Sequence, residues 1–173
     1  MRPLRISLAL LLCLPSVALA DETAAEAFAA LSKLQGQWEG EFANGRRHTV
    51  DYRLSAGGSV LVETWTLAPG RESITMYHLD GDRLLATHYC PQGNQPRLQR
   101  VDDGDPERIS FAFVDGTGLQ KPGGWHQDSF WVEFESDARY RRDEVYAPNA
   151  ATGETEEDAP PVSYRRVSAP TAD

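Results

Sequence analysis

His88 and Cys90 are two good metal ligands separated by a single residue. Side chains alternate between the two faces of a β-strand, so His88 and Cys90 would point the same way. Imidazole and thiolate both bind zinc and copper. His78 joins this face if the turn at residues 80–82 contains three residues, and it lies on the opposite face if the turn contains two. A structural zinc site needs four ligands, so we predict no metal and expect His88 to be a hydrogen-bonded wall residue.

Glu63 is the carboxylate best placed to act as a general acid or base. It lies between Leu61 and Trp65 on one face of a strand, and if that face points inward the carboxylate is removed from water. If the other face points inward, Glu63 is solvated. A third arrangement is a buried, structural ion pair with Arg53 or Arg142. The sequence leaves these alternatives open and assigns no catalytic residue.

Segment 91–97 is rich in hydrogen-bonding side chains. Asn94 and Gln95 carry amides, and the guanidinium of Arg97 can bind a carboxylate or phosphate through two parallel hydrogen bonds. The alternative is turn chemistry alone, with Arg97 on the surface. We predict a ligand site here and on two preceding strands, formed by His88, Tyr89, Asn94, Gln95, Arg97, Glu63 and Trp65.

Composition narrows the classes of partner. The formal net charge is −9 and the arginines are scattered among acidic residues, so we expect neither nucleic acid nor an anionic lipid surface as a partner. The sequence contains no Gly-x-Ser-x-Gly motif, phosphate loop or dinucleotide fingerprint. We therefore expect a small, largely apolar molecule as the partner, and no cofactor.

The first residues have the order typical of a secretory signal. Arg2 and Arg5 precede an apolar run over 6–14, and Ala18 and Ala20 are the small residues that signal peptidase requires. We predict cleavage after Ala20. The expected location is periplasmic or secreted.

Cleavage would leave a single domain over 21–173, with no segment inserted in a membrane. Cys13 follows Leu12 inside the apolar run and leaves with the signal, so no lipid anchor is expected. Cys90 is then the single mature cysteine, which excludes an intramolecular disulfide.

The rest of the sequence predicts one helix followed by short strands. Residues 23–33 are strong helix formers with apolar residues at helical spacing, and Thr23 is available as the N-cap. Residues 148–161 are acidic and lack an apolar period, which predicts a mobile loop. The ten predicted strands cover 37–43, 48–54, 59–67, 73–79, 83–90, 97–101, 108–114, 127–135, 140–146 and 162–167.

The short connections between these strands favour antiparallel neighbours, because parallel neighbours need long crossovers. Closure into a barrel removes the exposed edges of such a sheet, and a barrel somewhat larger than eight strands has room for a small ligand. We predict an all-β, closed, antiparallel up-and-down barrel with one N-terminal helix. A β-sandwich is the alternative.

The start of the first strand resembles the calycin group, which includes the lipocalins. In that group a Gly-x-Trp motif opens the first strand, the tryptophan plugs one end of the barrel, and an arginine from the last strand packs over it. Gly36 and Trp38 match this motif, and Arg165 or Arg166 can supply the guanidinium. The string from Tyr77 to Arg97 is similar to exported bacterial lipocalin-like proteins of unknown function.

Nitrobindin-type haem-binding barrels share a similar Gly-x-Trp-x-Gly opening, here residues 36–40. No histidine follows His126, so the haem-ligating histidine of those barrels has no counterpart that we can place. We therefore expect no haem.

These observations lead to three hypotheses of function. The first is a binding protein for a small, largely apolar ligand with a polar or anionic handle, which Arg97, His88 or Tyr89 would orient. The second is a cofactor-free isomerase or hydrolase with Glu63 or His88 as general base. The third is a periplasmic accessory protein whose barrel is filled by side chains.

Overall fold

The computed structural model describes residues 23–121, 123–149, 157–158 and 160–168. The predicted signal segment 1–20 and its cleavage site lie outside these residues. The elements are α1 (Ala24–Ser32), β1 (Gly36–Glu41), β2 (Arg47–Ser55), the 3₁₀ turn η1 (Ala56–Gly58), β3 (Val60–Ala68), β4 (Arg71–Asp80), β5 (Arg83–Tyr89), β6 (Gln95–Val101), β7 (Arg108–Thr117), β8 (Trp125–Ser136), β9 (Arg139–Pro148), β10 (Glu157–Asp158) and β11 (Val162–Ser168).

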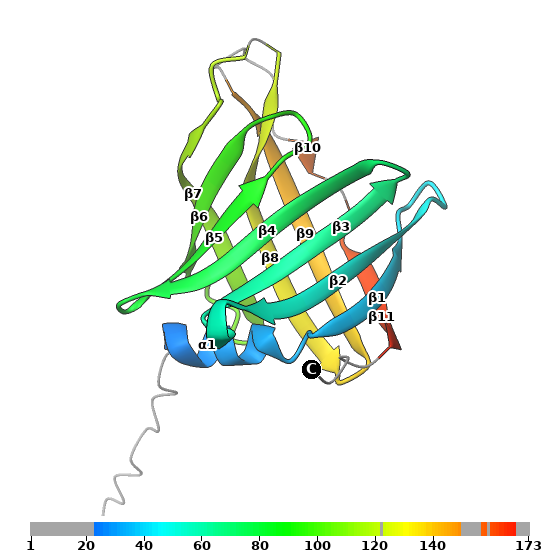
Figure 1. Ribbon diagram of the computed structural model, residues 1–173, viewed down its shortest axis with the longest axis vertical. Helices are drawn as coiled ribbons and strands as arrows, with labels where there is room; N and C mark the ends of the chain where they lie inside the picture. Colours follow the sequence, from blue (N-terminus) through cyan, green and yellow to red (C-terminus); the bar gives the residue numbers. More distant parts are fainter. Residues whose placement is uncertain (1–22, 122, 150–156, 159, 169–173) are drawn as a thin grey trace, which may run out of the picture.

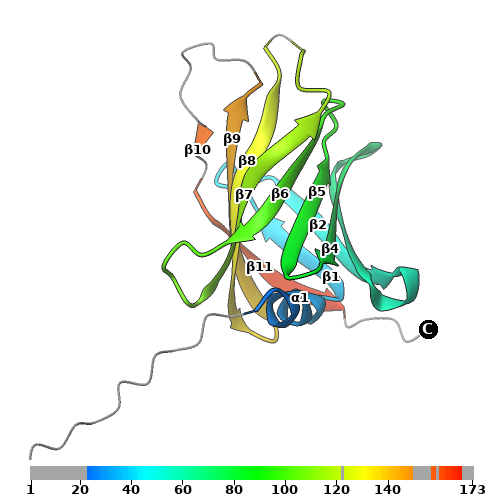
Figure 2. The same ribbon diagram turned by 90° about the vertical axis from the view of Figure 1, so that its left-hand side faces the viewer.

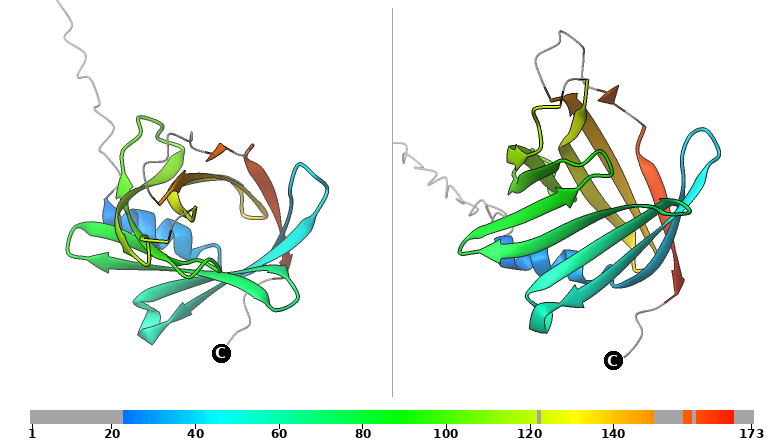
Figure 3. Two further views of the ribbon diagram at one scale, coloured as in Figure 1. Left: turned by 90° about the horizontal axis from the view of Figure 1, so that it is seen from above. Right: turned by 45° about the horizontal axis from the view of Figure 1, so that its top comes forward.

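Ten of these strands close into an antiparallel barrel (Figure 1). Strands β1 to β9 pair in chain order, β9 then pairs with β11, and β11 pairs with β1. Every one of these pairs is antiparallel, and the view along the barrel shows the closed ring (Figure 3). The predicted fold class is therefore confirmed, and the sandwich alternative is wrong.

Helix α1 covers one end of this barrel (Figure 2). It begins with a capping box, in which the Thr23 hydroxyl accepts from the Glu26 backbone N–H at 3.2 Å and the Glu26 carboxylate accepts from the Thr23 backbone N–H at 2.8 Å. Ala27 and Leu31 are fully buried against the barrel. The helix thereby seals this end.

The Gly-x-Trp-x-Gly opening has a separate role for each residue. Gly36 has φ of 110°, a conformation that favours glycine, and Trp38 is 1% exposed. A Cβ atom on Gly40 would lie 2.6 Å from Cε1 of Tyr164, so only glycine leaves room for that ring. The motif therefore sets the turn into β1, the plug of the barrel and the packing of β1 on β11.

Arg166 supplies the predicted arginine over the tryptophan. Its guanidinium carbon lies 4.2 Å from the ring centroid of Trp38. The same guanidinium donates to the carbonyls of Gln35 at 2.6 Å and Lys33 at 2.9 Å, just after α1 ends. Trp38 Nε1 also donates to the Leu34 carbonyl at 2.6 Å, so the helix, the plug and the last strand form one unit.

Two local predictions need correction. The loop predicted over 148–161 contains a short strand, because Glu157 and Asp158 pair with Tyr146 and Val145 of β9; residues 150–156 and 159 lie outside the described residues. The segment between β7 and β8 is shorter than predicted, since these strands extend to Thr117 and back to Trp125.

Candidate functional site

A cavity opens at the end of the barrel opposite α1. Its volume is about 430 Å³, and a second hollow of about 280 Å³ adjoins it. In an up-and-down barrel every second hairpin turn lies at the same end (Figure 3). Residues at and beside these turns line the cavity. The larger cavity is lined by Phe42, Arg46, Trp65, Leu67, Arg71, Ser73, His88, Cys90, Pro91, Gln92, Trp125, Glu144 and Tyr146.

The other half of the barrel is filled by side chains. Alternation along each strand directs one row of residues inward, and these pack beneath the cavity and against the helix. The buried core comprises Ala27, Leu31, Leu34, Trp38, Val50, Tyr52, Leu61, Trp65, Tyr77, Leu84, Ala86, Leu98, Ile109, Phe111, Phe130, Val132, Tyr140 and Tyr164. The barrel is thus solid near α1 and hollow at the opposite end.

Glu63 faces inward and forms a buried ion pair. Arg142 Nη1 donates to Glu63 Oε2 at 2.8 Å, and the Tyr77 hydroxyl donates to the same oxygen at 2.5 Å. Trp65 Nε1 donates to Glu63 Oε1. The structure thus selects the pair with Arg142 among the three arrangements that the sequence left open. Both carboxylate oxygens are occupied by donors, and Arg53 lies on the exposed face of β2.

Arg142 also connects this pair to a carboxylate beside the cavity. Its Nε donates to Glu144 Oε1 at 2.8 Å, and Gln127 Nε2 donates to the same oxygen at 3.1 Å. The Tyr146 hydroxyl approaches Glu144 Oε2 at 3.5 Å. Arg142, Glu144 and Tyr146 occupy alternate positions of β9, so they form one inward row from the core to the cavity.

The pKa values of Arg142 and Glu144, the two charged residues of this row, are both shifted, by different causes. Burial alone would lower the pKa of Arg142, but the carboxylate of Glu63 and other neighbouring groups hold that pKa well above its ordinary value. Burial raises the pKa of Glu144, and the attraction to Arg142 offsets only part of this effect. Glu63 and Arg142 therefore compensate each other's charge, and Glu144, whose side chain is 21% exposed, lies beside this pair with a raised pKa.

His88 is a neutral, hydrogen-bonded residue of the cavity wall. Its Nδ1 lies 3.0 Å from the Thr75 hydroxyl on the neighbouring strand. Burial, reinforced by the positive charge of Arg142, lowers the pKa of His88 to about 3. An imidazole with so low a pKa is a weak general base, because base strength falls with pKa.

The three residues considered as metal ligands do not come together. His88 and Cys90 line the same cavity, where burial raises the pKa of the thiol. Asp80 pairs with Arg83, so the turn between them has two residues and His78 lies on the opposite face from His88. Among the described residues, no group of three or more His, Cys, Asp or Glu side chains could hold a metal ion.

The two predicted amide side chains hold the segment between β5 and β6 in place. Asn94 is 1% exposed, and its Nδ2 donates to the Trp125 carbonyl at 2.7 Å. Gln95 Nε2 donates to the Gly93 carbonyl at 3.2 Å, and the Thr117 hydroxyl donates to Gln95 Oε1 at 2.5 Å. Neither amide lines the cavity; Asn94 ties this segment to the start of β8, and Gln95 ties it to the end of β7.

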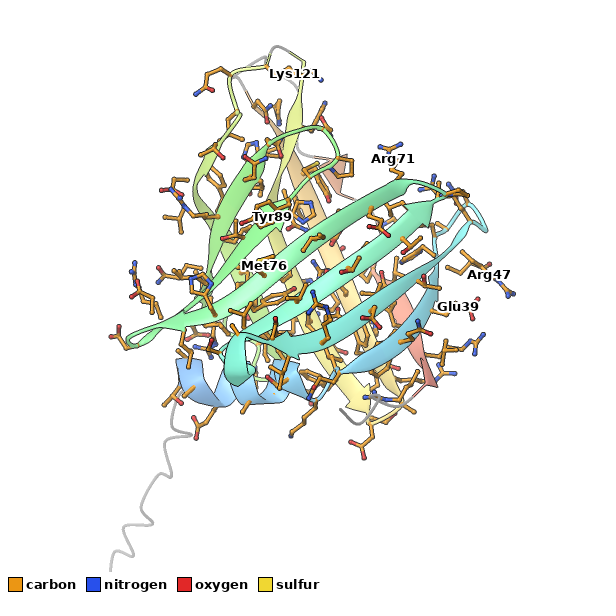
Figure 4. The ribbon with its side chains drawn as sticks, viewed as in Figure 1. Glu39, Arg47, Arg71, Met76, Tyr89 and Lys121 are labelled. Atoms are coloured by element: carbon orange, nitrogen blue, oxygen red, sulfur yellow. The ribbon has the colours of Figure 1, made fainter. Side chains whose placement is uncertain are left out.

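Arg97 and Tyr89 face away from the cavity. Arg97 Nη2 donates to Asp115 Oδ2 at 2.6 Å, and the arginine side chain is 52% exposed. Alternation along β6 buries Leu98 and turns Arg97 outward. Tyr89 is 44% exposed on β5 (Figure 4). Of the two alternatives that the sequence left open for Arg97, the structure shows the one in which this arginine lies on the surface. In this position Arg97 does not contact a ligand in the cavity.

Two arginines that sequence reasoning missed lie at the mouth of the cavity. Arg46 and Arg71 both line it, and within the described part of the chain neither has an ion-pair partner. Figure 4 shows Arg71 at the start of β4, at the open end. Arg46 lies 5.0 Å above the ring of Phe42. The sequence did contain a signal for these two arginines. Arg46 directly follows the glycine turn at 44–45, and Arg71 directly follows the glycine turn at 69–70. An up-and-down topology brings these two turns to the same end of the barrel.

Comparisons with known proteins support the fold. No family model matches the sequence, and no curated protein matches it. Among solved structures the chain is similar to Rv2717c from M. tuberculosis, with 17% sequence identity and a TM-score of 0.50 over 81% of this chain and 96% of that chain. At this identity the likeness shows the fold alone, a closed antiparallel barrel. No helix in the described residues is long and apolar enough to cross a membrane.

Proposed function

We propose that the protein binds a small, largely apolar molecule with an anionic handle in the open end of its barrel. The observation that carries this proposal is a cavity of about 430 Å³ with aromatic walls and two arginines at its mouth. Protein sites for small molecules are concave, mostly apolar, and typically about 300–1,000 Å³ in volume, with few polar groups that fix orientation.

The walls and the mouth supply different parts of the affinity. Trp65, Trp125 and Tyr146 offer apolar area for the body of the ligand. Arg46 and Arg71 offer planar guanidinium groups that match a carboxylate, sulfonate or phosphate. In an acidic protein, two arginines that have no carboxylate partner among the described residues make this mouth a favourable place for an anion. The handle site thus lies at these residues rather than at Arg97.

A comparison of two probes of equal size tests the proposal. We expect 2-naphthoate and the neutral 2-acetylnaphthalene both to bind the parent protein in calorimetric titrations at neutral pH. The double variant Arg46→Ala/Arg71→Ala should weaken naphthoate about tenfold or more, because each charge-assisted hydrogen bond contributes about 1.5–3 kcal/mol. Its affinity for acetylnaphthalene should change less than about twofold.

Arg97→Ala is the matched control, since this arginine is exposed and paired with Asp115 on the outer surface. It should leave both affinities unchanged. Failure of both probes to bind the parent protein, or equal losses for the two probes in the double variant, would contradict the proposal.

We further propose that the protein is exported and cleaved after Ala20. The support is the order of charge, apolar run and small residues in positions 1–20. N-terminal sequencing of the protein from the periplasm or medium of a secreting bacterium should begin at Asp21. An intact Met1 on that material would contradict it.

A further inference from the structure

His88 presents an unpaired ring nitrogen to the cavity. Its imidazole is 4% exposed, lies on the inner face of β5 and lines the cavity wall. Nδ1 is occupied by the Thr75 hydroxyl at 3.0 Å, whereas Nε2 has no hydrogen-bond partner among the described residues. Unlike Nδ1 of His48, which is unpaired and enclosed by protein atoms, His88 Nε2 retains contact with open space. Because the residue is otherwise buried, that space is the cavity.

The Thr75 hydroxyl decides which nitrogen of His88 carries the proton. Thr75 is 0% exposed, and within the described part of the chain its side chain has His88 Nδ1 as its one hydrogen-bond partner. A buried hydroxyl that only accepted from Nδ1–H would leave its own proton without an acceptor, which is unfavourable. The Thr75 hydroxyl therefore donates to Nδ1, and the neutral ring keeps its proton on Nε2. The cavity thus faces an N–H donor.

This donor suits an uncharged oxygen. Burial and the charge of Arg142 lower the pKa of His88 to about 3, so the ring carries no positive charge at neutral pH. An anion placed against it would lose its hydration without gaining an opposite charge, and a buried charge is unfavourable unless it is paired. A carbonyl oxygen accepts from an N–H without bringing a charge. An anion has its favourable place at the mouth, beside Arg46 and Arg71.

The donor lies deeper in the barrel than the mouth. Arg71, at the start of β4 (Figure 4), is followed at alternate positions by Ser73 and Thr75, so these residues form one inward row from the mouth. Thr75 lies opposite His88 on β5. The four residues from Arg71 to Thr75 span about 13 Å of strand. A ligand with two fused rings can therefore reach His88 while its other end meets the extended side chain of Arg71.

We propose that His88 Nε2–H is an inner, specificity-determining donor that recognises a carbonyl oxygen of the ligand. Thr75 is the positioning residue, because its hydroxyl fixes the proton of His88 on Nε2. This inference rests on the proposed function and deepens it by giving the ligand two polar ends. The anionic group lies at Arg46 and Arg71, and the uncharged carbonyl lies inside the barrel.

The test compares 6-acetyl-2-naphthoate with 6-isopropenyl-2-naphthoate, in which a CH₂ group of similar size replaces the carbonyl oxygen. We expect the acetyl probe to bind the parent protein about tenfold more tightly in calorimetric titrations, because the isopropenyl probe leaves the N–H without an acceptor. His88→Leu removes the donor and should bring the two affinities within about twofold. His88→Gln retains an N–H donor and should keep most of the preference.

Thr75→Val tests the positioning role, since valine has the shape of threonine without its hydroxyl. The preference for the acetyl probe should fall about threefold or more, because the proton is then shared between Nδ1 and Nε2. Nitrogen-15 NMR of histidine-labelled protein should show the His88 proton on Nε2 in the parent protein and a mixture of the two tautomers in Thr75→Val. Ser73→Ala is the matched control. It removes another hydroxyl from the same cavity wall and should preserve the preference.

The outcomes separate the two proposals. Equal affinity of the two probes for the parent protein overturns the proposed donor, and so does an NMR spectrum with the His88 proton on Nδ1. A preference that survives in a folded His88→Leu variant, verified by circular dichroism, or that disappears in Ser73→Ala, also overturns it. Failure of both probes to bind the parent protein, by contrast, removes the proposed function itself. Binding of both probes that depends on Arg46 and Arg71 but shows no carbonyl preference overturns the donor and leaves that function intact.

Discussion

Arg142 lies at the centre of the charged network inside the barrel. Its guanidinium joins two carboxylates, Glu63 and Glu144, in a region where the Arg142 and Glu63 side chains are each 1% exposed. Removing one partner of a buried ion pair leaves an uncompensated charge and costs about 3–5 kcal/mol, whereas replacing both partners is far less costly. We expect Arg142→Met to lower the free energy of unfolding in urea by that amount.

The double variant Glu63→Gln/Arg142→Met is the informative comparison, because it also removes the more deeply buried of the two carboxylates that Arg142→Met leaves without a partner. It should recover a large part of the stability lost in Arg142→Met. Equal unfolding free energies for the single and double variants would show that the ion pair does not set this cost.

Glu144 should make anion binding depend on pH. It lies beside Arg142 and Tyr146, lines the cavity that also holds His88 and Arg46, and has a pKa raised by burial. Protonation of Glu144 as the pH falls removes a negative charge near the bound anion. The affinity for 2-naphthalenesulfonate, which stays ionised throughout, should therefore rise as the pH falls.

Glu144→Gln should bind this sulfonate at pH 8 as tightly as the parent protein does at low pH, with little further change on acidification. Titrations at several pH values measure both. A pH dependence that persists unchanged in Glu144→Gln would assign it to another group.

Of the residues predicted from the sequence, Trp65 and His88 line the cavity, whereas Arg46 and Arg71 were missed and the partners of Glu63 were left open. Glu63 and Trp65, at alternate positions of β3, and His88, on β5, do face the interior. Which face points inward depends on packing between strands far apart in the chain, so the pairing of Glu63 with Arg142 stayed one alternative among three. Arg97 was misleading because an arginine beside a polar loop looks the same in sequence whether it binds Asp115 or a ligand.

At the scale of elements, the opening of β1 should tolerate no larger residue at Gly40. A methyl group there would lie 2.6 Å from the Tyr164 ring, which is itself stacked on Tyr140 at 4.5 Å. Overpacking of this kind costs about 1–3 kcal/mol. We expect Gly40→Ala to lower the thermal midpoint, and to lower it less when it is introduced into Tyr164→Leu, where the methyl group has room.

Gly45→Ala tests a different effect, because a Cβ atom at Gly45 meets nothing within 4 Å although φ is 79°. Its cost should come from backbone strain alone, and Tyr164→Leu should not relieve it. Equal responses of the two glycine variants to Tyr164→Leu would contradict the steric explanation for Gly40.

The elements themselves were largely predictable, for a local reason. Alternating runs such as 109–113 and glycine turns such as 44–45 specify strands and hairpins through a few neighbouring residues. Strand β10 was not predictable, because its two residues, Glu157 and Asp158, carry no strand signal and are placed only by pairing with β9. The face of His78 was equally open, because it depends on one residue of turn length.

At the scale of the whole molecule, side chains fill the barrel near α1, and a cavity occupies the opposite end. His48 and His88 are buried near this cavity. Burial, followed by the charge of Arg46, lowers the pKa of His48 to about 4, and burial with Arg142 lowers that of His88 to about 3. Both rings are neutral in the folded protein at neutral pH. His48 is stacked between Phe42 and Trp65, with centroid distances of 4.1 and 4.9 Å.

The free energy of unfolding should therefore fall on acidification. In the unfolded chain a histidine takes up its proton near pH 6.5, whereas in the folded protein His48 and His88 resist protonation until about pH 4 and pH 3. Their contribution is complete above pH 6.5 and decreases by about 1.4 kcal/mol per pH unit for each histidine below it. The raised pKa of Glu144 opposes this trend, because the folded protein then binds a proton that the unfolded chain releases.

Urea unfolding at pH 7 and pH 5 should show a net loss of about 2–4 kcal/mol in the free energy of unfolding, and His88→Gln should reduce the dependence of that free energy on pH by about half. Equal stability at the two pH values, or an unchanged slope in His88→Gln, would show that the buried histidines do not control the acid response.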